Sequence, residues 1–248
     1  MGAKIRLDKY LADMGIGTRT EVKAYIRKGK VTVNDTVTKS PELKIDTDKD
    51  QVCFEHQPVG YVRQEYYLFY KPAGCVSATG DKTHRTVLDY IDAKRKDLFP
   101  VGRLDIDTEG LLLITNDGAL AHQLLSPKKH VKKTYYARID GLVTAEDVRA
   151  FEEGVDIGEE KLTMPADLEI LSAGEISEIL ITICEGKYHQ VKRMFEAVGK
   201  KVIYLKRLSM GTLTLDAALQ PGEYRSLTKQ EIAALRQQTP KEEEREQE

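Results

Sequence analysis

Short apolar runs separated by turn-forming residues are the feature that most restricts the fold of this chain. Strand candidates at 66–70, 111–115, 135–139 and 178–183 are each long enough for a single strand, and they are interleaved with segments of helical periodicity at 145–153 and 190–198. No apolar run approaches the roughly 18 residues that a membrane-spanning helix needs. The pattern therefore predicts an α+β fold and no contact with a membrane.

The N-terminal segment shows a different pattern. Apolar residues first recur at helical spacing, at Leu7, Tyr10, Leu11 and Met14. Thr18 and Glu21 have the spacing of a capping box and predict a second helix, which Gly29 ends. Alternating residues at 30–33 and 36–38 then predict a hairpin, with Asn34 and Asp35 in the turn.

The composition changes twice along the chain. Residues 58–64 have the character of a linker, and the residues after 235 are too polar and acidic to pack. We therefore predict a small domain at 1–60, a larger one at 64–235 and a disordered acidic tail at 236–248.

The distribution of charge favours a polyanionic partner although the net charge of the chain is −2. Residues 1–30 contain eight basic and three acidic side chains, and residues 185–207 contain seven and two. A third cluster consists of Lys128, Lys129, Lys132 and Lys133. One such cluster is ordinary solvated surface, but three of them favour a partner such as nucleic acid.

The cysteines indicate neither a disulfide framework nor a zinc site. Cys53, Cys75 and Cys184 are odd in number and far apart, with no Cys-x-x-Cys pair and no histidine at ligand spacing. The start of the chain shows no basic-then-apolar leader, so we expect a cytoplasmic protein.

An acidic segment just before the apolar run at 111–115 has several possible roles. Asp105, Asp107 and Glu109 mimic the opening of an EF-hand loop, but Asn116 stands where the bidentate glutamate belongs. A phosphatase of the Asp-x-Asp type needs an apolar strand before Asp105, whereas residues 101–103 are Val, Gly and Arg. The spacing of Asp105, Asp107 and Thr108 alone favours a structural role, in which they cap and turn the chain into the next element, and it leaves a catalytic role open.

Four motifs in order resemble those of bacterial rRNA pseudouridine synthases. They are KPAG at 71–74, GRLDIDTEGL at 102–111, KTY at 133–135 and EGKYHQVKRM at 185–194. Residues 4–50 resemble the alpha-L RNA-binding motif that this family commonly carries, with Asp35 in place of the usual glycine. The resemblance implies a mixed, largely antiparallel sheet in the catalytic domain. The YHQVKRM run and LTMPA at 162–166 are most similar to the branch that modifies one uridine of 16S rRNA.

The resemblance also implies roles for particular residues. Asp105 matches the catalytic carboxylate, and Lys192 matches the cation that keeps it ionised, with Arg193 in reserve. Tyr135 matches the aromatic residue that stacks on the target base. Arg103 fits the wedge that fills the stack when the uridine is extruded. Ile183 could pack on the uracil, but a core role is favoured, and Cys184 and His189 are interpreted as structural.

The remaining expectations concern partners and cofactors. RNA phosphates are expected to contact Arg193 and the basic residues of the N-terminal module, namely Arg6, Lys9, Arg19, Lys23, Arg27 and Lys28. With no nucleotide-binding glycine motif and no metal cluster, we expect no cofactor and no metal. The predicted partner is 16S rRNA in an assembling small ribosomal subunit, bound by a monomer. The alternatives are a 23S rRNA synthase of the same family and a non-catalytic RNA-binding assembly protein.

Overall fold

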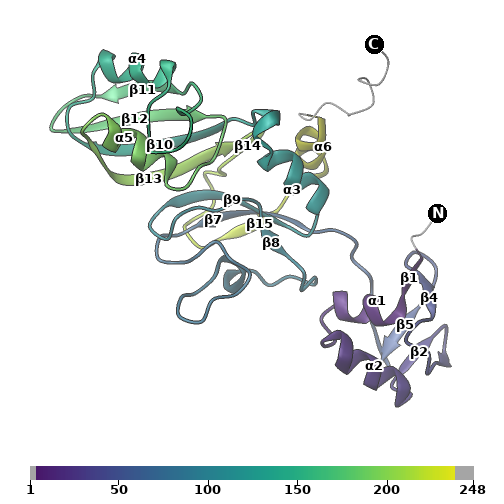
Figure 1. The fold of residues 1–248 in the computed structure, drawn as a ribbon. Coiled ribbons are helices and arrows are strands. Elements are labelled where there is room, and N and C mark those ends of the chain that lie inside the picture. The colour runs from purple at the N-terminus through teal and green to yellow at the C-terminus, as the bar shows by residue number, and fades with distance from the viewer. Residues whose placement is uncertain (1–3, 238–248) are drawn as a thin grey trace, which may run out of the picture. The chain divides into compact units, whose positions relative to one another are not determined.

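The computed structural model describes residues 4–237 and divides the chain into two compact units (Figure 1). Among the described residues, the first unit comprises 4–65 together with Asp92–Leu98, and the second comprises Tyr66–Ile91 and 99–237. The segment 92–98 was not anticipated, because the sequence placed it inside the domain at 64–235. Most of the predicted tail, 238–248, lies outside the described residues, whereas Arg236 and Gln237 belong to a helix.

The first unit begins with β1 (Lys4–Arg6), α1 (Leu7–Asp13) and α2 (Arg19–Arg27). Thr18 and Glu21 form the expected capping box at the start of α2. The predicted hairpin is also confirmed, as β2 (Val31–Val33) and β3 (Thr36–Val37), with positive φ angles at Asn34 and Asp35. Both residue types tolerate this left-handed conformation, which explains how the turn forms without glycine.

Short strands complete the first unit. β4 (Lys44–Asp46) pairs with β1, while β5 (Val52–Phe54) and β6 (Gln57–Pro58) extend the hairpin into a sheet of order β3-β2-β5-β6. The core is built from one face of each helix and the inward side of the strands, and contains Leu7, Tyr10, Leu11, Val22, Ile26, Val31, Ile45 and Val52.

Arg95 explains why the segment 92–98 belongs to the first unit. Its guanidinium is 3% exposed and lies 3.4 Å from the Asp13 carboxylate, and Nη1 donates to the carbonyl of Val62 at 3.1 Å. The backbone N–H of Arg95 also donates to Glu65. A buried guanidinium needs such partners, because an unpaired buried charge is costly.

A nine-stranded sheet of order β11-β12-β10-β13-β9-β7-β15 forms the second unit, with β14 paired to β13 and β8 paired to β9. The bounds of its strands are β7 (Tyr66–Lys71), β8 (Phe99–Pro100), β9 (Glu109–Thr115), β10 (Lys133–Asp140), β11 (Asp167–Ser172), β12 (Ile176–Ile183), β13 (Lys201–Met210), β14 (Leu213–Thr214) and β15 (Tyr224–Ser226). Only the β13–β9 pair is parallel among these described strands. The predicted α+β class with a mixed, largely antiparallel sheet is confirmed.

Helices cover different parts of this sheet. α4 (Ala145–Glu153) contacts β11 and α5 (Gln190–Ala197) contacts β13, and Phe151 and Phe195 pack edge to face between these two helices. Both helices match the predicted segments closely. The described part of the second unit also contains α3 (Gly118–Leu125), α6 (Lys229–Gln237) and the short 3₁₀ helices η1 (Val87–Tyr90) and η2 (Pro127–Lys129).

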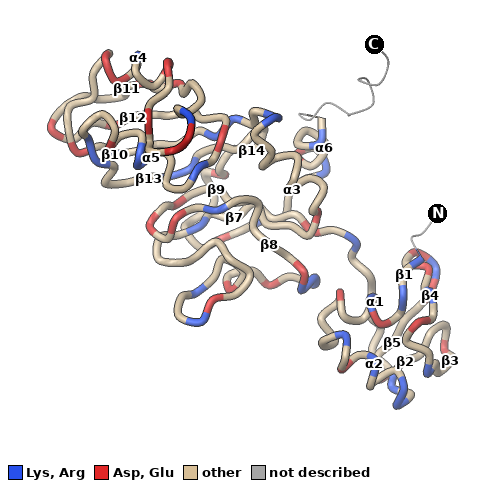
Figure 2. Tube along the Cα trace, in the orientation of Figure 1, with Lys and Arg blue, Asp and Glu red and all other residues tan. Residues whose placement is uncertain are grey.

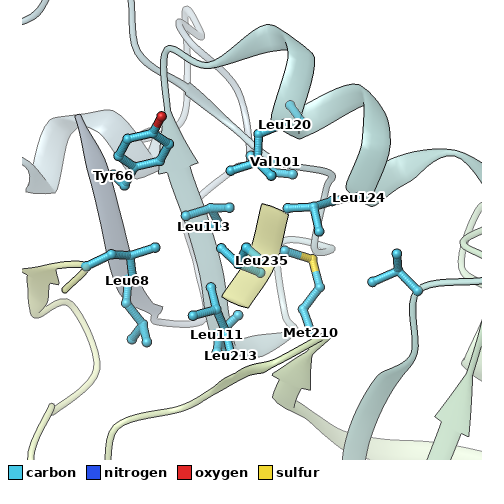
Figure 3. Packing of buried hydrophobic residues seen from close by; sticks show 13 residues of the cluster. Tyr66, Leu68, Val101, Leu111, Leu113, Leu120, Leu124, Met210, Leu213 and Leu235 are labelled. Carbon is cyan, nitrogen blue, oxygen red and sulfur yellow. The ribbon is translucent and has the colours of Figure 1, made fainter. Parts of the chain in front are cut away.

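The core of the β7–β9 half holds the sheet against α3 and α6. Figure 3 shows Leu111 and Leu113 of β9 beside Leu235 of α6, with Leu120 and Leu124 of α3 nearby. Alternate residues of β9 face this core, as expected for the period of two along a strand. Among residues 4–237, no helix is both long and apolar enough to cross a membrane.

Candidate active site

A pocket in the second unit brings together three of the four sequence motifs. Its wall includes residues 103–105 and 108 from the loop before β9, Tyr135 of β10, Ile183 of β12 and Leu205 of β13. The rest of the wall comes from the turn before α5 and from the first turn of that helix, namely Gly186, Lys187, His189, Gln190, Val191 and Lys192. The predicted residues Arg103, Asp105, Tyr135 and Lys192 therefore line one pocket.

Asp105 lies between two nitrogen-bearing side chains. Its Oδ2 is 3.1 Å from Lys192 Nζ, and its Oδ1 is 3.5 Å from His189 Nε2. The side chain of Asp105 is 25% exposed, so it is partly enclosed and yet accessible from the pocket. The ammonium group of Lys192 attracts this carboxylate and orients it within the pocket.

Lys192 also binds Asp107, which points more towards solvent. Lys192 Nζ donates to Asp107 Oδ1 at 2.7 Å, and the Asp107 side chain is 67% exposed. Burial raises the pKa of Asp107, but the hydrogen bond and charge of Lys192 outweigh it, so the pKa lies below its usual value. Burial likewise lowers the pKa of Lys192, and the hydrogen bonds to Asp107 and Asp105 more than reverse this and raise it. The lysine therefore stays charged between two carboxylates.

The loop that carries Asp105 is held by the KPAG motif. Lys71 is completely buried, and its Nζ donates to the carbonyls of Thr108 at 2.8 Å and Ile106 at 3.4 Å. Burial lowers the pKa of this lysine. The Gly74 N–H also donates to the Ile106 carbonyl at 2.7 Å. These bonds fix the backbone on the C-terminal side of Asp105.

The other side of the same loop is anchored by Ser77. Its hydroxyl donates to the Leu104 carbonyl at 2.9 Å and accepts from the Leu104 N–H at 3.0 Å. Asp105 is therefore held between two fixed stretches of backbone, which limits the positions that its carboxylate can adopt.

The apolar wall of the pocket comes from the centre of the sheet. Tyr135 is 7% exposed and sits on β10 opposite Ile181 of β12 and Arg207 of β13. Ile183, which the sequence analysis interpreted as a core residue, is 3% exposed and also lines the pocket. Tyrosine and isoleucine on adjacent strands offer flat and apolar surface, which suits a nucleobase.

The turn before α5 positions Lys192 through a buried amide. Gln190 Nε2 donates to Glu185 Oε1 at 2.8 Å, and Gln190 Oε1 accepts from the Lys187 N–H at 2.9 Å. The positive φ of His189 turns the chain into the helix. Lys192 then follows in the first turn and faces the loop of Asp105.

Two predictions from the sequence need revision at this turn. Arg193 points away from Asp105, because Nη1 binds Glu159 at 2.7 Å and donates to the Tyr188 carbonyl at 3.1 Å. In this structure it pairs with Glu159 and not with Asp105, and its contact with RNA stays a prediction. His189, interpreted as structural, lines the pocket and faces Asp105. The sequence feature that could have indicated a place in the pocket for His189 is its position three residues before Lys192.

The basic residues of the first unit are spread over its helices, strands and loops and are interspersed with acidic residues (Figure 2). Arg19, Arg27 and Lys28 are exposed. Arg6 is exposed but binds Asp8 and Glu42, Lys9 binds Asp13, and Lys23 lies 3.9 Å from Asp8. Contacts of these side chains with RNA stay predictions. Within residues 4–237, no group of three or more His, Cys, Asp or Glu side chains could hold a metal ion.

The fold and the pocket together define a class of protein. The structure superposes on a solved "Crystal structure of pseudouridylate synthase" with a TM-score of 0.66 and 39% identity, covering 93% of this chain and 99% of that one. A model described as RNA pseudouridylate synthase matches residues 65–197, and a model described as S4 domain matches residues 5–52. The chain belongs to the RNA pseudouridine synthase family, which confirms the resemblance inferred from the four motifs.

Curated relatives cover nearly the whole chain. An uncharacterized RNA pseudouridine synthase of Bacillus subtilis is 47% identical over 93% of this chain and 98% of its own length. Ribosomal small subunit pseudouridine synthase A of Vibrio cholerae is 43% identical over 93% of this chain and 99% of its own. The protein of the same name from Escherichia coli is 40% identical over 93% and 100%.

Proposed function

We propose that the protein isomerises one uridine of 16S rRNA to pseudouridine, with Asp105 as the catalytic carboxylate. The observation that carries this assignment is the placement of Asp105 3.1 Å from Lys192 in a pocket walled by Tyr135. The two relatives named ribosomal small subunit pseudouridine synthase A, each matched over almost its entire length, support 16S rRNA as the substrate.

The reaction leaves the elemental composition of the substrate unchanged. The bond between C1′ and N1 breaks, the uracil turns and C5 bonds to C1′, after which the C5 proton is released to solvent and N1 takes up a proton from solvent. Asp105 acts either as a nucleophile or as a charge that stabilises the sugar while the base is detached. Lys192 fixes the direction of this carboxylate through the ion pair at 3.1 Å.

Tyr135 and Ile183 hold the uracil in this proposal. Both side chains are almost fully buried and line the pocket, so they contact the faces of the base and hinder its escape during rotation. The enzyme then distinguishes uridine from other nucleotides by how well the base fits the pocket beside Tyr135 and Ile183.

Arg103 supports entry of the uridine into the pocket. It is exposed, lines the pocket and lies two residues before Asp105. A uridine within folded RNA must leave its stack before the enzyme can reach C1′, and the planar guanidinium can stack in the space that it leaves.

The first unit supplies affinity for RNA. Arg19, Arg27 and Lys28 are exposed and can reach phosphates, and such contacts position RNA without reading its sequence. RNA shape then selects the substrate, so we place the reaction on an assembling small subunit in the cytoplasm, with a monomeric enzyme.

Chemical mapping of pseudouridine in 16S and 23S rRNA tests this function. Cells that lack the protein are expected to lose one pseudouridine of 16S rRNA, and the wild-type gene, but not Asp105→Asn, is expected to restore it. Loss of a 23S site instead would refute the substrate and retain the chemistry. Unchanged rRNA, with no turnover by the purified enzyme, would favour a non-catalytic assembly protein.

A further inference from the structure

Tyr188 is an exposed aromatic residue beside the pocket that the proposed mechanism leaves unused. It is 75% exposed, the highest value among the large hydrophobic residues that stand out at the surface of the described chain. Its ring stacks on the ring of His189, with centroids 3.8 Å apart and an interplanar angle of 18°. Tyr188 thus has one face covered by His189, and its high exposure leaves the other available to a ligand.

The stacked pair connects directly to the catalytic pocket. His189 lines the pocket, and its Nε2 lies 3.5 Å from Asp105 Oδ1. A ring stacked on the open face of Tyr188 would therefore lie beside the pocket that receives the target uridine. In an RNA strand, the flat ring that follows or precedes the extruded uridine is the base of a neighbouring nucleotide.

The backbone under Tyr188 is held in place although the side chain is exposed. Arg193 Nη1 donates to the Tyr188 carbonyl at 3.1 Å and binds Glu159 at 2.7 Å. Lys187 Nζ donates to the carbonyls of Leu162 at 3.2 Å and Lys161 at 3.3 Å. These bonds tie the turn to residues 159–162, so little further ordering is needed when a ligand stacks on it.

The chemistry around the pair favours a nucleotide over an apolar protein segment. Lys187 directly precedes Tyr188, and Arg193 donates to the Tyr188 carbonyl, so two cations lie close to this turn, each of them also paired with a carboxylate, Glu185 and Glu159 respectively. Unpaired RNA bases bind proteins by stacking on aromatic side chains, while nearby cations attract the phosphates.

We propose that Tyr188 and His189 form an aromatic platform that stacks an unpaired nucleotide next to the target uridine. This inference rests on the proposed function, because the platform receives a second base of the same substrate. The platform holds the RNA strand while the uridine enters the pocket, so Tyr188 acts on binding of the RNA and not on the chemical step.

Two variants of Tyr188 distinguish a ring that stacks on an RNA base from a side chain that only covers the ring of His189. Tyr188→Leu keeps an apolar side chain but removes the ring, and we expect it to weaken binding of the substrate RNA roughly five- to 150-fold. Tyr188→Phe keeps the ring and is expected to retain most of the affinity. Leu171→Ala serves as the matched control, because Leu171 is 47% exposed on β11 and does not line the pocket.

The decisive experiment combines the protein change with a change in the RNA. Affinity and initial rates are measured on an RNA that carries the mapped uridine, and on the same RNA with an abasic ribose at either neighbouring position. Removing the stacked base should weaken binding to the wild type but hardly affect Tyr188→Leu, and the loss should fall on KM more than on kcat.

The possible failures are distinguishable. Equal losses for Tyr188→Leu on the intact and abasic RNAs, or a loss confined to kcat, would overturn the platform and indicate that Tyr188 only covers His189. Unchanged affinity of Tyr188→Leu for an RNA that the wild type converts would also overturn it and spare the proposed function. Failure of the wild type to form pseudouridine in any rRNA would refute the proposed function itself.

Discussion

Gly110 lies where the β7–β9 half of the sheet meets the half that contains β10 and β13, and replacing it with alanine should separate the two strands that meet there. Gly110 pairs with Arg207 in the parallel β9–β13 contact and has a φ of +105°. A Cβ at this position would lie 2.2 Å from the Arg207 carbonyl oxygen and 2.7 Å from its nitrogen. Both are backbone atoms of a central strand, so no side-chain rotation can relieve the clash.

The expected loss of stability in Gly110→Ala is the sum of two contributions. Holding alanine at a positive φ costs about 1–3 kcal/mol, and overpacking in a well-packed interior costs about another 1–3 kcal/mol. Gly74 is the matched control, because it has a φ of +89° but no atom within 4 Å of the added Cβ. We therefore expect Gly110→Ala to lower the free energy of opening by about 2–6 kcal/mol, and Gly74→Ala to lower it by about 1–3 kcal/mol.

Hydrogen–deuterium exchange of peptides from β9 and β13 is the suitable assay. It measures the free energy of opening of this part of the sheet, whereas a global denaturation curve would combine the two units. If Gly110→Ala and Gly74→Ala lower the opening free energy equally, to within about 0.5 kcal/mol, the reasoning from the Arg207 backbone is refuted.

Three further predictions concern charge. Lys192→Met should lower kcat on the order of tenfold to a thousandfold by removing the cation beside Asp105, and initial rates within twofold of wild type would contradict this. Arg27→Glu combined with Lys28→Glu should flatten the slope of log affinity against log salt by about 0.9 per lost contact with duplex RNA, or 0.7 with a single strand; an unchanged slope would show that this helix end does not contact phosphates. Burial and a hydrogen bond to a carboxylate raise the pKa of Tyr66 to about 12, so its contribution to stability is present below about pH 10 and is lost as the pH rises towards 12. Urea denaturation across this range should show a steeper loss for wild type than for Tyr66→Phe.

Local sequence signals predicted the elements that depend on local contacts. The capping box of Thr18 and Glu21 forms α2, and the Asn34–Asp35 pair forms its turn, because the partners are adjacent in the chain. The central strand β13 was missed, because Lys206 and Arg207 interrupt its apolar pattern. Arg207 is buried there and its Nε donates to the carbonyl of Leu111, a partner 96 residues away that no local pattern reveals.

The candidate site shows the same limit. The motifs indicated Asp105 and Lys192 through a family resemblance, and the structure places them together. The hydrogen bonds by which Lys71 holds the loop of Asp105 were not predictable, because in the sequence Lys71 only marks the end of a strand before a turn. Its role depends on carbonyls 35 and 37 residues later in the chain.

The most direct test of the account compares Asp105→Asn with Asp107→Asn. Both carboxylates bind Lys192, but Asp105 lines the pocket at 25% exposure, whereas Asp107 is 67% exposed and does not line it. The measurement is release of tritium from rRNA labelled at uridine C5, with RNA affinity determined in parallel. We predict no detectable release by Asp105→Asn with little change in affinity, and most of the wild-type rate for Asp107→Asn. Release by Asp105→Asn near the wild-type rate would contradict the assignment of this carboxylate as the catalyst.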